Sequence, residues 1–180
     1  MFSGEYGVTL DDACRLSLPR SFRSALETNS VYVCRGREGC IWLFTAERWK
    51  KLAETVVVST NPQSEEMASN PFFDEGRAYS RRFLGTSHQL DIDKNGRILI
   101  PPRLREYANL DKDCILLGQF DFIEIWDKDS YEEYLDASEE EYKAASRELG
   151  TRILKERELS NYGNSAHSGL AGGDNAISGS

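Results

Sequence analysis

The sequence is poor in the features that mark metal, redox and membrane proteins. It has only four cysteines and two histidines among 180 residues. The cysteines (Cys14, Cys34, Cys40 and Cys114) form no Cys-x-x-Cys pair, and neither histidine stands at ligand spacing from a cysteine, so neither a metal site nor a disulfide framework is predicted. No apolar run approaches the roughly 20 residues that cross a bilayer. We expect reduced thiols and no membrane partner.

Signatures of catalysis are also missing. There is no Gly-x-Ser-x-Gly elbow, no phosphate-binding loop and no dinucleotide-binding glycine motif. His88 has no serine or cysteine beside it in a nucleophile context. The N-terminus lacks the basic start and apolar stretch of a signal peptide, which predicts a cytoplasmic protein. We therefore expect no enzyme, no cofactor and no small-molecule substrate.

The negative charge of the chain is concentrated near its C-terminus. The net charge is −8 overall, but +1 over residues 1–60, zero over residues 61–110 and −9 over residues 111–180. Binding to phosphates depends on the local field of a surface rather than on net charge. A nearly neutral body can therefore still present a basic face to nucleic acid.

The chain contains an internal repeat. Shifting it by 82 residues aligns Leu10–Pro19 with Ile92–Pro101, and agreement continues without gaps for some 40 positions. Two copies are too few for a solenoid, so they indicate a pseudo-two-fold domain. The identical pairs are Asp11 and Asp93, Arg15 and Arg97, Pro19 and Pro101, Arg23 and Arg105, Gly36 and Gly118, and Ile41 and Ile123.

Each copy predicts the same order of elements. A strand leads through a polar turn to a second, alternating strand, and a proline then opens a short helix. Two tightly joined strands follow, and a capped helix closes the copy. The paired strands are Val31–Arg35 with Ile41–Phe44 and Cys114–Leu117 with Phe122–Trp126, and the helix caps are Thr45 and Asp127.

Five segments follow from this pattern. A helical linker, with a helix over Asp74–Phe83, separates the copies, and a capping box at Ser138–Glu141 predicts the start of a C-terminal helix. The end of the chain is rich in Gly, Ser and Asn, which is typical of disorder. The segments are 1–58 (first repeat), 59–83 (linker), 84–137 (second repeat), 138–159 (C-terminal helix) and 160–180 (disordered tail).

The Asp-x-x-x-Arg turns are the main candidates for function. Asp11 and Asp93 can accept backbone N–H groups and tighten their turns. If Leu16 and its counterpart Ile98 face the core, alternation places Arg15 and Arg97 outward, where they could reach phosphates or a guanine edge. The alternative is an Asp–Arg pair that only staples its own hairpin. The repetition does not decide between them, because a fold can need the same staple twice.

Further basic side chains could extend this face. Arg20 and Arg23 lie on the first short helix, and Arg103 and Arg105 on the second. A solvated helix face is the plainer interpretation of all four, and the same holds for the Arg81–Arg82 pair. Trp42, Trp49 and Trp126 stand at core spacing, so we expect them to pack rather than to stack on bases.

Several motifs together resemble the MraZ family over roughly residues 1–145. They are Met-Phe-x-Gly at the start, Asp11 followed by Arg15–Pro19, Arg82 followed by Leu84-Gly85, Asp93 followed by Gly96–Pro101, Leu116–Asp121 and Glu124–Asp127. The resemblance implies an α+β fold of two tandem AbrB-like repeats, which form a pseudo-two-fold swapped-hairpin barrel decorated with helices.

The resemblance also implies a function. It implies a bacterial transcriptional regulator that is cytoplasmic, nucleoid-associated and assembled into homo-oligomeric rings. Such a regulator binds short direct repeats in the double-stranded promoter DNA of the division and cell-wall gene cluster, usually as a repressor. In the family the arginine of the turn contacts DNA, which here falls on Arg15 and Arg97. Lys94 and Gly96 belong to the same motif in the second copy.

The first turn departs from the family pattern. Ala13 and Cys14 stand where the family usually has lysine and glycine. Loss of the lysine removes one phosphate contact, and loss of the glycine costs about 1–2 kcal/mol if the turn keeps a positive φ. DNA contact through this turn is therefore expected to be weakened or reshaped. The alternative function is an oligomeric scaffold or protein-interaction module with little affinity for DNA.

Overall fold

The computed structural model describes residues 1–26, 28–60 and 74–167. The chain separates into two units, Met1–Tyr134 and Leu135–Ser180. The expected loops of residues 61–73 and the end of the expected tail, residues 168–180, lie outside the described residues.

The described chain is α+β, as predicted. The first copy forms β1 (Phe2–Thr9), β2 (Arg15–Ser17), α1 (Arg20–Ala25), β3 (Ser30–Arg35), β4 (Ile41–Phe44) and α2 (Ala46–Thr60). The helix α4 (Asp74–Phe83) leads into the second copy. That copy forms β5 (His88–Asp91), β6 (Arg97–Leu99), α5 (Pro102–Tyr107), β7 (Asp113–Phe120), β8 (Phe122–Asp127) and α6 (Lys128–His167).

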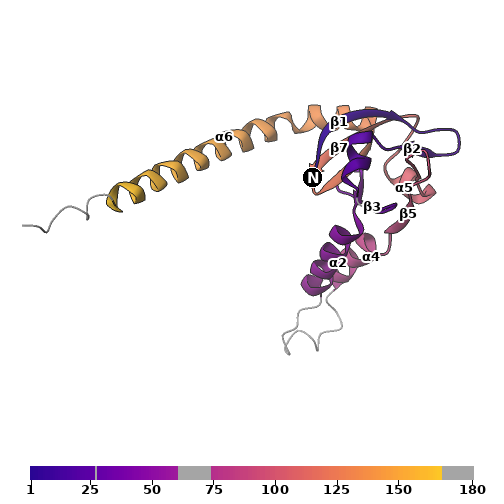
Figure 1. The fold of residues 1–180 in the computed structure, drawn as a ribbon, viewed down its shortest axis with the longest axis horizontal. Coiled ribbons are helices and arrows are strands. Elements are labelled where there is room, and N and C mark those ends of the chain that lie inside the picture. The colour runs from indigo at the N-terminus through magenta and orange to yellow at the C-terminus, as the bar shows by residue number, and fades with distance from the viewer. Residues whose placement is uncertain (27, 61–73, 168–180) are drawn as a thin grey trace, which may run out of the picture. The chain divides into compact units, whose positions relative to one another are not determined.

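The two copies are interleaved rather than side by side as separate domains. One antiparallel sheet has the order β1-β7-β8-β4-β3-β5, and β2 pairs with β6 in a second sheet. The first strand of each copy therefore pairs with a strand of the other copy, as β1 does along the whole of β7 (Figure 1). Leu16 pairs with its repeat counterpart Ile98, and Trp42 with Glu124, so a pseudo-two-fold axis passes by both pairs.

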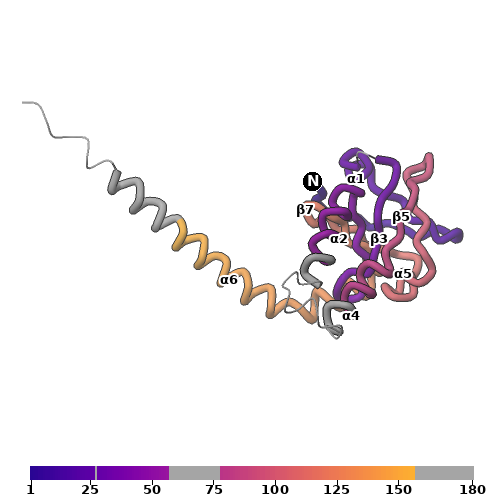
Figure 2. The backbone as a smooth tube through the Cα atoms, turned by 90° about the horizontal axis from the view of Figure 1, so that it is seen from below, coloured from indigo at the N-terminus to yellow at the C-terminus, as the bar shows by residue number. Residues whose placement is uncertain are grey.

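A single core serves both copies. Leu16, Ile98, Phe22 and Leu104 are buried in it, as the repeat predicts. Burying each such side chain contributes roughly 1.5–3 kcal/mol. A second cluster of buried side chains packs against α2 and α4. The two helices contact each other and β3, and Figure 2 shows their backbones close to this strand. Because each copy supplies part of the main core, neither copy can bury its apolar face alone.

Helix starts follow the predicted caps. The Thr45 hydroxyl accepts the N–H of Arg48 at 3.2 Å, and the Asp127 carboxylate accepts the N–H of Ser130 at 3.0 Å. Both bonds satisfy donors that a helix N-terminus leaves unpaired. The core positions predicted for Trp49 and Trp126 are also confirmed, since both side chains are buried.

The gapless repeat needs one correction. Val33 pairs with Leu43, and Leu116 pairs with Ile125. Leu43 and Ile125 are 82 residues apart, whereas Val33 and Leu116 are 83 apart, because the connection that precedes β7 is one residue longer. The identity of Gly36 and Gly118 is therefore a coincidence of alignment.

The predicted helix start at Ser138 is wrong. The helix α6 runs without a break from Lys128 to His167, beyond the expected end near residue 159 and into the expected tail. The Ser138 hydroxyl donates back to the carbonyl of Leu135 at 3.4 Å instead of capping a new helix. Extending an existing helix adds one hydrogen bond per residue, which favours continuation over a new start.

Candidate nucleic-acid interface

The first turn is organised by the carboxylate of Asp11. Its Oδ1 accepts the backbone N–H groups of Ala13 at 3.0 Å and Arg15 at 2.9 Å, and its Oδ2 accepts Nε of Arg15 at 2.9 Å. The backbone N–H of Asp11 donates to the carbonyl of Arg15 at 2.9 Å, and that of Cys14 donates to the carbonyl of Asp11 at 2.7 Å. One side chain therefore fixes both the turn and the direction of the arginine.

The second turn repeats this network. Oδ1 of Asp93 accepts the N–H groups of Asn95 at 2.8 Å and Arg97 at 3.0 Å, and Oδ2 accepts Nε of Arg97 at 2.9 Å. The backbone bonds from Asp93 to Arg97 and from Gly96 to Asp93 are present as well. Both turns thus contain the Asp–Arg pair that staples the hairpin, and the pairing does not decide what else the arginines contact.

Both stapling carboxylates are held in their charged form. The N–H of Arg15 lowers the pKa of Asp11, partly opposed by desolvation, and the guanidinium of Arg15 lowers it further. The N–H and guanidinium of Arg97 act in the same way on the pKa of Asp93. Hydrogen bonds to an ionised carboxylate favour that form. The turns are therefore built for pH values at which both carboxylates are ionised.

The turns lie next to each other. The N–H of Leu18 donates to the carbonyl of Gly96 at 2.9 Å, and the N–H of Ile100 donates to the carbonyl of Cys14 at 3.1 Å. Nη1 of Arg97 also reaches Oδ2 of Asp11 across the two copies at 3.4 Å. The two Asp–Arg pairs therefore form one cluster at the ends of the β2–β6 ribbon.

The two arginines face outward, as alternation predicts, but not to the same degree. Leu16 and Ile98 are fully buried, whereas the side chain of Arg15 is 39% exposed and that of Arg97 is 24% exposed. Within the described residues, Arg15 bonds a carboxylate through Nε alone. Arg97 uses Nε, Nη1 and Nη2 in carboxylate contacts. The outer fork of Arg15 is therefore the freer one.

The short helices contribute arginines to the opposite turn. A Cβ atom at Gly96 would collide with the guanidinium of Arg23, so this α1 side chain lies over the second turn. Nη1 of Arg105, from α5, contacts Sγ of Cys14 in the first turn at 2.7 Å. Arg23 and Arg20 are exposed, as is Lys94 in the second turn. The sequence marks Arg23 and Arg105 as equivalent, but it gives no sign that each crosses to the other copy.

The substituted position in the first turn keeps the glycine conformation. Cys14 has φ 59°, and its counterpart Gly96 has φ 76°. A residue with a Cβ atom is strained there by about 1–2 kcal/mol. The first turn therefore keeps its conformation although Cys14 is strained there. A cysteine in place of glycine at position 14 alters the side chain of the turn and leaves its backbone shape unchanged.

Other candidate sites receive no support within the described part of the chain. No three His, Cys, Asp or Glu side chains gather there as metal ligands, and no helix in those ranges combines the length and apolar character needed to cross a membrane. Burial raises the pKa of Cys34 and of Cys114 to about 12, which leaves these thiols unreactive at neutral pH.

The chain is similar to known proteins over most of its length. A family model described as "MraZ protein, putative antitoxin-like" matches residues 1–70 and 83–153. A transcriptional regulator MraZ from Treponema denticola is 37% identical over 148 residues, which cover 82% of this chain and 96% of that protein. A protein of the same name from Salinispora arenicola is 37% identical over 142 residues, 79% of this chain and 92% of that protein. The regulator MraZ of Pediococcus pentosaceus is 35% identical over 149 residues, with 83% and 96% covered.

Proposed function

This chain belongs to the MraZ family, and from this premise we propose that it is a transcriptional regulator, not an enzyme, and that it binds double-stranded DNA through its paired turns. The observation that carries the proposal is the cluster of the two Asp–Arg pairs, which meet across the three-residue β2–β6 ribbon. Each guanidinium is held by a carboxylate and faces outward, which limits the entropy that a DNA contact would cost.

The side chains have different roles in this proposal. Arg15, with its free outer fork, is suited to a guanine edge or a phosphate. Arg97 supports that arrangement and adds charge. Lys94, Arg20 and Arg23 supply exposed positive charge for phosphates, while Asp11, Asp93 and Gly96 shape the turns.

Affinity is expected to depend on assembly. A single chain offers few basic groups at the turns, so several copies meeting spaced DNA repeats would gain by avidity. We accordingly extend the proposal to a homo-oligomeric ring that binds short direct repeats in the promoter of the division and cell-wall gene cluster and represses it. The protein would act in the cytoplasm, on the nucleoid, with its two sheets closed as an AbrB-like barrel.

A mobility-shift assay with the DNA upstream of the protein's own gene tests the proposal. We expect Arg15→Ala to weaken binding by at least about tenfold, since a bidentate base contact discriminates by about 1–3 kcal/mol. Arg97→Ala should have a smaller effect, because that guanidinium is more occupied. Arg15→Lys keeps the charge and loses the fork, so it separates base recognition from phosphate contact.

Arg147→Ala is a matched control, because Arg147 is an exposed arginine on α6. It should bind DNA like the wild type. Sedimentation velocity should show unchanged assembly for every variant. If the Arg15→Ala/Arg97→Ala double variant binds as the wild type does, these turns are not the DNA site. If the wild type ignores its upstream DNA at low salt, the scaffold function is favoured instead.

A further inference from the structure

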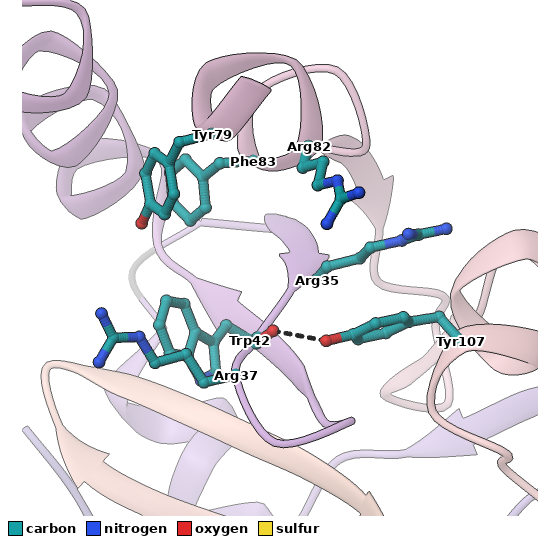
Figure 3. Close-up of a pocket in the computed structure, with 8 residues that line it drawn as sticks. Arg35, Arg37, Trp42, Tyr79, Arg82, Phe83 and Tyr107 are labelled. Atoms are coloured by element: carbon teal, nitrogen blue, oxygen red, sulfur yellow. Dashed lines mark hydrogen bonds between the residues drawn. The ribbon is translucent and has the colours of Figure 1, made fainter. Parts of the chain in front are cut away.

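A second cluster of basic side chains lies around a pocket that the DNA proposal does not use. The pocket has a volume of about 200 Å³ and lies between β3, β4, α4 and α5. Figure 3 shows Arg35, Arg82, Trp42, Phe83 and Tyr107 around it. We propose that this pocket binds a small organic anion, in which a phosphate or carboxylate group is carried on a flat ring.

The arginines of the pocket have no acidic partner among the residues that the structure describes. Arg35, Arg37 and Arg82 all line the pocket, and none of them forms an ion pair with a carboxylate of the described residues. Three unpaired guanidinium groups around one cavity produce a local positive field. Guanidinium forks match the geometry of phosphate and carboxylate groups. An anion is therefore the complementary ligand.

The Arg35 side chain is held in position beside the pocket. Its guanidinium carbon lies 4.6 Å from the centre of the Tyr107 ring, in a cation–π contact. The Tyr107 hydroxyl in turn donates to the carbonyl of Gly36 at 2.8 Å (Figure 3). A ligand that bound Arg35 would therefore meet a preorganised side chain.

Two donors at the pocket are buried without an acceptor. Nε of Arg35 and Nε1 of Trp42 have no hydrogen-bond partner among the described residues, although both atoms are shielded from solvent. Buried donors normally have acceptors, because leaving them unpaired costs free energy. An acceptor oxygen on a ligand would remove that cost once the side chains that cover these atoms had moved aside.

The remaining walls are aromatic. The rings of Tyr79 and Phe83 are stacked, with centroids 5.7 Å apart and an interplanar angle of 11°. Trp42 meets Phe83 edge to face, with centroids 6.3 Å apart. Flat apolar walls with a few convergent polar groups are typical of small-molecule sites. The volume is below the roughly 300 Å³ at which such sites usually begin, so the ligand should be smaller than a typical drug.

The symmetry-related positions of the fold carry side chains of a different kind. The pseudo-two-fold places Gly118 at the position of Arg35, Glu124 at that of Trp42 and Ala25 at that of Tyr107. The symmetry-related place, built from β7 and β8 of the second copy and α1 of the first, therefore has the same backbone elements without the arginine and the two aromatic rings. Trp42 and Phe83 also pack in the cluster beneath α2 and α4, so the difference bears on Arg35: the repeated backbone does not need an arginine here, which favours binding as its role.

Calorimetric titration of the full-length protein with phenyl phosphate tests the proposal. Benzoate serves as the carboxylate counterpart, and inorganic phosphate and phenol present the anion and the ring separately. Phenyl phosphate or benzoate should bind more tightly than either separate part. Arg82→Ala should weaken this binding at least about tenfold, because it removes one charge-assisted contact. Arg37→Ala should weaken it in the same direction.

Arg81→Ala is the matched control, since Arg81 is the exposed neighbour of Arg82 on α4 and does not line the pocket. It should leave the dissociation constant within about twofold of the wild type. An equal loss in Arg81→Ala would mean general surface charge and would overturn the proposal. The proposal would also be overturned if the wild type bound neither phenyl phosphate nor benzoate. If Arg82→Ala then changed the oligomer in sedimentation velocity, the pocket would be a contact between copies of the chain instead.

Discussion

The two turns have the same backbone but different side-chain chemistry. Residues 11–15 carry two acidic groups and one arginine, whereas residues 93–97 carry one acidic group, a lysine and an arginine. The second turn thus has the charge that suits DNA. The first has the less occupied arginine, because Arg97 spans both carboxylates and Arg15 bonds only one. The more basic turn therefore belongs to the second copy, and the arginine with fewer carboxylate contacts belongs to the first.

The difference shows which residue determines the turn. Position 14 has lost the glycine, yet its φ of 59° remains close to the 76° of Gly96. What the turns share is the aspartate with its bonds to two backbone N–H groups and one guanidinium. The hydrogen bonds of the carboxylate thus hold the conformation of the turn, and a glycine only lowers its strain energy.

The largest expected effect comes from giving the second turn the residue of the first. Gly96→Cys should lower the free energy of unfolding by about 1–2 kcal/mol, because it places a Cβ atom at positive φ. The overlap with Arg23 should add little, since an exposed arginine can move, as Arg105 is accommodated beside Cys14. Urea denaturation followed by circular dichroism measures the change.

Cys14→Gly is the reciprocal control. It should stabilise the protein by about as much as Gly96→Cys destabilises it, because the strain at positive φ and the larger backbone entropy that glycine loses on folding enter both changes with opposite signs. If Cys14→Gly is destabilising, the cysteine contributes a contact, most directly with Arg105, that outweighs the strain at φ 59°.

The next effect concerns charge in the first turn. Ala13→Lys should raise the affinity for the upstream DNA about fivefold at 0.15 M salt, since each phosphate contact changes the salt slope by about −0.9. Binding measured across a salt series gives both values. Ala13→Gln is the uncharged control of similar size. A gain in Ala13→Lys that does not depend on salt would contradict a phosphate contact at this position.

Much of the fold was predictable because it depends on local patterns. The strands around Leu16 and Ile98, the short helices after Pro19 and Pro101 and the cap at Thr45 follow from alternation and capping preferences. The predicted helix start at Ser138 also rested on a local pattern, the capping box. That prediction was wrong because a helix that has already formed continues through a weak capping sequence.

The candidate site was predictable only in part. The sequence identifies the turn residues and their repetition. It does not show that Arg97 reaches Asp11 or that Arg23 lies over Gly96, because these contacts depend on how the copies are interleaved. The pocket beside Arg35 has no periodic or motif signal, since its residues come from β3, β4, α4, α5 and the β3–β4 connection.

The smallest expected effect is a loss of stability in acid. The pKa values of Asp11 and Asp93 in the folded chain lie below their ordinary value of 3.8. The unfolded chain therefore binds protons first as the pH falls. The contribution of each carboxylate is complete above the unfolded pKa and is lost as the pH falls through the folded one. The urea midpoint should accordingly fall between about pH 5 and pH 2.

Substitution separates the two turns in this titration. Asp11→Asn and Asp93→Asn should each flatten the acid limb of the stability curve, because the amide cannot be protonated in that range. Asp11 accepts bonds from two arginines and Asp93 from one, so we expect the larger flattening from Asp11→Asn. Asp12→Asn, an exposed neighbour without such bonds in the described chain, should leave the curve nearly unchanged. If the Asp11→Asn/Asp93→Asn variant loses stability in parallel with the wild type, other carboxylates govern acid unfolding, and the staples serve orientation of the arginines rather than stability.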